Sequence, residues 1–146
     1  MYSQALRSSP IHTPHGSVKA HWDAQILTIH TQGPFNLEGI HQGGMLIRNA
    51  VKNRKHDQWL RLDIADNESL GEPGVIDAIT SNYLWSFKNG CKAMALVYCN
   101  SLQKALYDNF MQDQSINFKA FYTIGEANDW LEHYANSSEI DINKVV

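Results

Sequence analysis

The stretch Cys91-Lys92-Ala93-Met94-Ala95-Leu96-Val97-Tyr98-Cys99 decides the fold class. Its middle, Ala93–Tyr98, is apolar at every position, so both faces of a strand formed here would be buried. A strand that is covered on both sides is typical of a parallel sheet with helices on its two faces. The stretch therefore predicts an α/β protein with this strand near the middle of its sheet.

The segments on either side of this strand alternate between helix and strand patterns. Upstream, residues 59–64 predict a strand, Pro73 suits the first turn of a helix, and Asn89-Gly90 is typical of the end of that helix. Downstream, Asn100 or Ser101 caps the next helix, residues 116–122 form the last strand, and the capping box of residues 123–126 starts the last helix. Strands joined through helices are expected to lie parallel with right-handed crossovers.

The N-terminal part of this body predicts a β-hairpin followed by a helix. An Asp23-Ala24 loop would place five apolar residues on one buried face: Val18, Ala20, Trp22, Leu27 and Ile29. Asn36 is a suitable N-cap for a helix that runs to about residue 53, with Phe35 and Ile40 as its hydrophobic staple. Glycines 43 and 44 within this helix indicate a close approach of the helix to the sheet.

The predicted architecture is thus a β-β-α-β-α-β-α-β-α superhelix with a mostly parallel sheet and one antiparallel N-terminal strand. Residues 1–16 are expected to form an irregular arm, residues 17–135 the folded domain, and residues 136–146 a polar C-terminal tail. A chain of 146 residues fits one domain of this kind.

Composition and charge exclude several classes of function. The net charge is −3 with scattered basic residues, so we expect no nucleic-acid partner. The longest apolar runs are far shorter than the roughly 20 residues of a membrane span, and residues 1–14 do not resemble a secretory signal. We expect a cytoplasmic protein whose two cysteines, Cys91 and Cys99, stay reduced because they lie too far apart on one strand to form a disulfide.

Neither a metal nor a cofactor is expected. The seven histidines form no recognised ligand motif, and in the hairpin register above His21 and His30 are roughly 13 Å apart. There is no nucleophile elbow, and no catalytic residue is assigned. Cys99 follows the strand where α/β sites occur, but a buried thiol is the preferred interpretation.

The order of elements and some local residues resemble the STAS/SpoIIAA-like superfamily of small regulatory domains. The similarity covers residues 17–135 and includes Gly33-Pro34-Phe35 before the first helix, and Glu126-Ala127 with Trp130-Leu131 in the last. The resemblance implies that a serine in the loop after the third strand is phosphorylated and controls partner binding. Ser69, with Asp66 three residues upstream, lies near that position, although the family places the acidic residue next to the serine.

The loop of residues 65–74 is accordingly the first candidate site, with Asp66, Ser69 and Glu72 as its phosphorylation or partner-binding residues. Trp85 is predicted to lie opposite the core stripe of the second helix, where it would form an interface with a partner or a second copy. The leading hypothesis is a non-enzymatic regulatory domain that binds a protein partner.

Two other functions remain open. One branch of the family that this chain resembles is discussed as binding small apolar or lipid-like ligands. In this chain such a pocket would be lined by Trp22, Phe35, Tyr83 and Phe87. The third hypothesis is a small hydrolase or isomerase in which Asp63 and Asp66 divide the acid and base roles.

Overall fold

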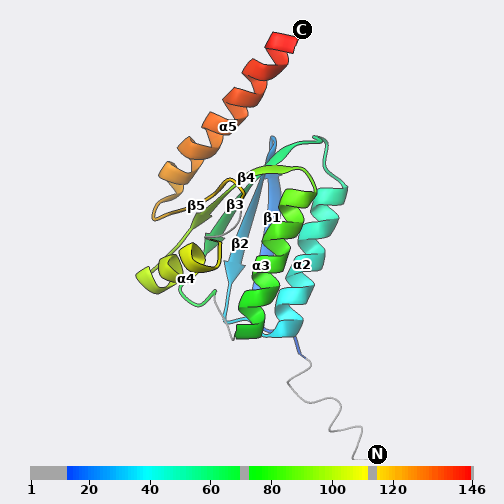
Figure 1. Ribbon diagram of the computed structural model, residues 1–146. Helices are drawn as coiled ribbons and strands as arrows, with labels where there is room; N and C mark the ends of the chain where they lie inside the picture. Colours follow the sequence, from blue (N-terminus) through cyan, green and yellow to red (C-terminus); the bar gives the residue numbers. More distant parts are fainter. Residues whose placement is uncertain (1–12, 70–72, 112–114, 146) are drawn as a thin grey trace, which may run out of the picture.

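The computed structural model describes residues 13–69, 73–111 and 115–145, which form one mixed β-sheet with helices packed on it (Figure 1). Across the sheet the strands follow their sequence order. β1 is antiparallel to β2, and all the other neighbouring strands are parallel. This confirms the predicted α/β arrangement with one antiparallel N-terminal strand. The elements are β1 (Ser17–Asp23), β2 (Ile26–Gln32), α2 (Leu37–Lys52), β3 (Trp59–Ala65), α3 (Pro73–Lys88), β4 (Cys91–Val97), α4 (Ser101–Met111), β5 (Phe118–Phe121) and α5 (Ile124–Val145).

The β1–β2 hairpin differs from the prediction in its loop. Trp22 pairs with Leu27 and Asp23 with Ile26, so Ala24 and Gln25 form the loop, and Ala24 adopts a positive φ of 54°. The observed register is two residues away from the predicted one. A shift of two residues keeps every side chain on its face of the sheet. The predicted inward set is therefore confirmed, and Val18, Ala20, Trp22, Leu27 and Ile29 all pack in one cluster with α2.

Alternate residues of β3 and β4 supply two separate cores. Leu60, Leu62 and the alanines of β4 pack against Ala127 and Leu131 of α5. Met94 and Leu96 point to the other face, where they pack with Val75, Ile79 and Tyr83 of α3 and with Tyr107 of α4. Helices therefore cover both faces of the central strands, as the apolar run of residues 93–98 predicts.

The helix ends follow the local sequence. The Asn36 side chain accepts from the Gly39 N–H at 2.9 Å, and Asn100 caps α4 through the Gln103 N–H at the same distance. Thr123 caps α5, since its Oγ1 accepts from the Glu126 N–H at 3.2 Å and also donates to Glu126 Oε1 at 2.9 Å. α5 continues as one helix to Val145 and projects past the sheet (Figure 1). None of the helices within the described residues is long and apolar enough to cross a membrane.

The neighbouring glycines 43 and 44 of α2 have different surroundings. Gly39, Gly43, Ile47 and Val51 form its buried stripe, and a methyl group at Gly43 would collide with Val18 of β1. The predicted close approach of helix and sheet is therefore confirmed at Gly43. At Gly44 the expected close approach to the sheet is absent, because this residue points toward α3, where an added methyl group would lie 3.6 Å from Asn82 Nδ2, an ordinary contact.

Alanine at these two neighbouring positions is expected to have opposite effects. Gly44→Ala should raise the free energy of unfolding by about 1 kcal/mol, because alanine favours the helix and the new methyl group fits. Gly43→Ala should lower it by roughly 1–3 kcal/mol, because Val18 is stiff and must move. Urea unfolding of both variants measures the difference. Equal effects would show that α2 does not approach β1 as closely as described.

Candidate functional site

A cavity lies between the sheet, α2 and α3, and is called the core cavity here. Its apolar wall consists of Val18, Phe35, Ile40, Ile47, Ile79 and Leu96. The cavity is narrow: the space open to the centre of a water-sized sphere is about 40 Å3, which is room for only a few water molecules. An apolar space with a few convergent polar groups is the usual form of a small-molecule site.

The floor of the core cavity carries a buried ion pair from the centre of the sheet. Arg61 and Asp63 are two residues apart on β3, so they share a face, and they are only 2% and 3% exposed. Arg61 Nε and Nη2 donate to the two oxygens of Asp63 at 2.7 and 2.9 Å. Burial opposes the charge of Arg61, but the charge and hydrogen bonds of Asp63 outweigh it, so the pKa of the guanidinium is raised.

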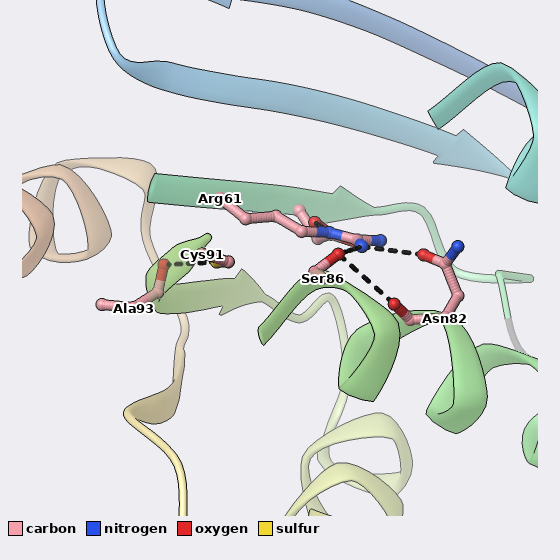
Figure 2. A network of polar contacts seen from close by, with 6 residues as sticks. Arg61, Asn82, Ser86, Cys91 and Ala93 are labelled. Carbon is pink, nitrogen blue, oxygen red and sulfur yellow. Dashed lines mark hydrogen bonds and ion pairs between the residues drawn. The ribbon is translucent and has the colours of Figure 1, made fainter. Parts of the chain in front are cut away.

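α3 completes the contacts of this guanidinium. Figure 2 shows the Arg61 side chain reaching Asn82 and Ser86, and its Nη1 donates to Asn82 Oδ1 and Ser86 Oγ, each at 2.7 Å. The ring of Tyr83 lies 5.0 Å from the guanidinium carbon. No fully buried side-chain nitrogen or oxygen within the described residues lacks a hydrogen-bond partner. Each buried polar atom of the network therefore has at least one partner within the described residues.

Two phenols stand beside the ion pair. Tyr83 and Tyr107 pack in the same core cluster, and both line the core cavity. Burial raises the pKa of Tyr83 well above its usual value, and burial together with the charge of Asp63 raises that of Tyr107. Both phenols consequently remain neutral at physiological pH. Arg61 and Asp63 are then the only charged groups among the described residues of the lining.

The predicted loop site is folded inward. Asp66 Oδ1 accepts from Gly33 N, Glu68 N and Ser69 Oγ, at 3.2, 3.1 and 2.7 Å. Ser69 Oγ also lies 2.9 Å from Thr31 Oγ1 and accepts from Asp66 N at 2.8 Å. We call these contacts, which join Asp66 and Ser69 to each other, to Glu68 and to residues 31–33, the loop latch. It ties the β3–α3 loop to the end of β2.

Ser69 is therefore not on the surface. It is 3% exposed and lines the core cavity, so a kinase could reach its hydroxyl only after the loop latch opened. The sequence pattern could not predict the burial of Ser69, because its partners come from the end of β2 and from its own loop. Glu72, the third predicted residue of this site, lies outside the described residues.

The aromatic residues predicted for a ligand pocket divide into two groups. Phe35 and Tyr83 line the core cavity. Trp22 instead packs edge-on against Trp59 with ring centroids 5.7 Å apart, and its Nε1 donates to Ala50 O. Phe87 is partly buried beside the same cluster and is not among the described residues of the lining.

Trp85 does not stand free on the outer side of α3. It is half-buried against the cluster that α2 shares with the sheet, and the Arg48 guanidinium carbon lies 5.1 Å from its ring centroid. The helical periodicity correctly places Trp85 on a different face of α3 from Tyr83 and Ile79. That face is not exposed to solvent, because α2 packs alongside α3 (Figure 1). Its packing within the chain accounts for Trp85 without an interface.

Asp63 and Asp66, the predicted acid and base, are both held by fixed donors. Asp63 is engaged on both oxygens by Arg61, and Asp66 is engaged by the loop latch. Asp63 is therefore not free to take a proton from a substrate in this arrangement, and Oδ1 of Asp66 already accepts from three donors. The geometry gives the hydrolase or isomerase hypothesis no support.

The two hairpin histidines are closer than predicted. His21 lies opposite Thr28 and His30 opposite Lys19, which brings the two rings into a stack with centroids 6.0 Å apart. The observed register causes this change from the predicted separation. Across the part of the chain that the structure describes, no three metal-ligating side chains come together.

The two cysteines are expected to react very differently. Burial raises the pKa of Cys91 to about 12, whereas Cys99 is exposed at the end of β4. Only thiolates react rapidly, so at pH 8 a disulfide reagent should modify Cys99 in the folded protein and Cys91 only after denaturation. Mass analysis of the labelled peptides measures this. Equal labelling of both thiols in the native state would contradict the burial of Cys91.

Comparisons with solved structures identify the fold. An uncharacterised protein of the DUF3478 family from Shewanella loihica PV-4, described as having a SpoIIAA-like fold, superimposes with a TM-score of 0.59 at 17% identity, over 81% of this chain and 94% of that chain. An anti-sigma factor antagonist from Mycobacterium paratuberculosis superimposes with a TM-score of 0.57 at 8% identity, over 86% and 98%. The chain therefore has the STAS/SpoIIAA-like fold that the sequence resemblance predicts. No protein-family model and no curated protein matches it.

Proposed function

We propose that this chain is a non-enzymatic regulatory domain that binds a small ligand in the core cavity and thereby changes its affinity for a protein partner. The observation that carries the proposal is the core cavity itself, which combines an apolar wall with buried polar groups. Such a lining can hold the body of a small molecule and also fix its orientation.

Ser69 connects the core cavity to the outside of the domain. Its hydroxyl lines the cavity, and the same hydroxyl belongs to the loop latch that holds the β3–α3 loop. A ligand that contacts or displaces Ser69 changes the hydrogen bonds of the latch, and so changes the population of loop conformations. Regulation of this chain thus needs no surface phosphoserine.

A protein partner is the second half of the proposal. The structural neighbour from Mycobacterium paratuberculosis is an anti-sigma factor antagonist, so the same fold serves protein regulation in that protein. In this chain the partner-binding surface would be the β3–α3 loop. Asn67 and Glu68, which follow Asp66 in this loop, are exposed. A ligand that alters the loop latch would alter this surface.

The first test is ligand binding followed by NMR. Labelled protein is exposed separately to xenon, methylenecyclohexane, cyclohexanone and cyclohexanecarboxylate. At least one probe should shift the methyl resonances of Ile47, Ile79 and Leu96, which line the core cavity. Gly44→Leu, which fills the mouth of the cavity, should abolish the shifts, while Gly44→Ala should leave them.

Hydrogen exchange then tests the regulatory half. Binding should change the exchange rates of the Glu68 and Ser69 amides, because they donate to Asp66 Oδ1 and to the Asp66 carbonyl oxygen. If no probe shifts the cavity methyl groups, the proposed function is wrong. If the methyl groups shift while exchange in the loop is unchanged, the ligand site stands and its link to the loop does not.

A further inference from the structure

The amide of Asn82 has a fixed orientation at the edge of the core cavity. Arg61 Nη1 donates to Asn82 Oδ1 at 2.7 Å, and an arginine side chain has no acceptor, so the oxygen must face Arg61. The Nδ2 amide group therefore points away from the ion pair, as Figure 2 shows. Its two N–H groups donate to no other group within the described residues.

This amide group stands at the mouth of the cavity. A groove of about 740 Å3 runs between α2 and α3, and it shares Ile40, Gly44 and Asn82 with the core cavity. Gly44 has no side chain to close the passage, and Asn82 Nδ2 lies 3.6 Å from the place where a Cβ would be. A molecule that enters past Gly44 thus meets hydrogen-bond donors that no described group uses.

The charges of the lining favour a neutral ligand. Arg61 and Asp63 neutralise each other, and Tyr83 and Tyr107 remain neutral. A carboxylate or an ammonium group placed here would be a buried charge without a counter-ion, which is strongly unfavourable. Arg61 offers one further N–H on Nη2, beyond its four hydrogen bonds to described residues, and this also suits an acceptor oxygen.

We propose that the core cavity binds a small, neutral carbonyl compound whose oxygen accepts a hydrogen bond from Asn82 Nδ2. The apolar body of the ligand lies against Phe35, Ile40 and Ile79. Asn82 determines specificity, because it distinguishes ligands that carry an acceptor from hydrocarbons of the same shape. This inference rests on the proposed function, since it assigns the chemistry of the ligand in the same cavity.

A matched set of probes tests the chemistry. Cyclohexanone and methylenecyclohexane have nearly the same shape, but only the ketone has an acceptor oxygen. The unmodified protein should bind the ketone at least about tenfold more tightly than the alkene. Cyclohexanecarboxylate should bind more weakly than the ketone at pH 7, where it is ionised. Methyl-resonance titrations provide all three affinities.

Asn82→Asp is the matched variant. It keeps an oxygen facing Arg61 and removes both amide N–H donors, so the ketone should lose its advantage over the alkene. Asn117→Asp, the same substitution at an exposed residue that does not line the cavity, is the control that should leave the preference intact. Equal affinity of ketone and alkene in the unmodified protein, or an unchanged preference in Asn82→Asp, would overturn this inference and leave the proposed function standing. Failure of every probe to bind would overturn both.

Discussion

Asp63→Ala is expected to lower the free energy of unfolding by about 3–5 kcal/mol. The variant leaves Arg61, which is 2% exposed, without its counter-ion and takes the acceptor from two more of its N–H groups. Arg61 cannot escape this situation by losing its proton, because an arginine side chain stays protonated in proteins. A domain of this size has about 5–15 kcal/mol of stability in total, so the loss is severe.

The control removes both charges together. An Arg61→Met, Asp63→Leu double variant fills similar volume with apolar atoms and should recover most of the lost stability. Urea unfolding of the single and double variants measures the coupling between the two residues. A single variant that unfolds at the same urea concentration as the unmodified protein would show that the pair is not buried as described.

The strand faces and helix ends of this fold could be predicted from sequence because they depend on local rules. Alternation with a period of two places Trp22 and Leu27 on one face, and Asn36 and Thr123 cap helices through neighbours within three residues. The hairpin register could not be predicted in the same way. A shift of two residues preserves the alternation, so the pattern alone does not choose between the two loops.

The candidate site depends on contacts that no local rule contains. Arg61 and Asp63 stand at alternate positions of a predicted strand, and this pair of opposite charges within an apolar run was the available signal for the buried network. Its partners Asn82 and Ser86 lie on α3, and nothing in their own segment marks them. The cavity itself follows from how the side chains of α2, α3 and the sheet fill space together. Trp85 shows the same limit, since periodicity gives its direction on α3 but not the presence of α2 there.

Asp66→Ala is expected to open the loop latch and to lower the free energy of unfolding by about 2–4 kcal/mol. One oxygen of Asp66 accepts from Gly33 N, Glu68 N and Ser69 Oγ, and alanine leaves all three donors without it. The effect stays below the sum of three separate hydrogen bonds, because Asp66 is only half-buried and water can replace part of what is lost.

Asp66→Asn separates the role of the charge from that of the acceptor. Asparagine keeps one oxygen at the position of Oδ1, so it should hold the same three donors and cost less than about 1 kcal/mol. Hydrogen exchange at the Gly33 and Glu68 amides reports the latch directly, and it should accelerate in the alanine variant only. Unchanged exchange in Asp66→Ala would mean that close packing between Gly33 and the Glu68 carbonyl, and not the carboxylate, holds the loop over the core cavity.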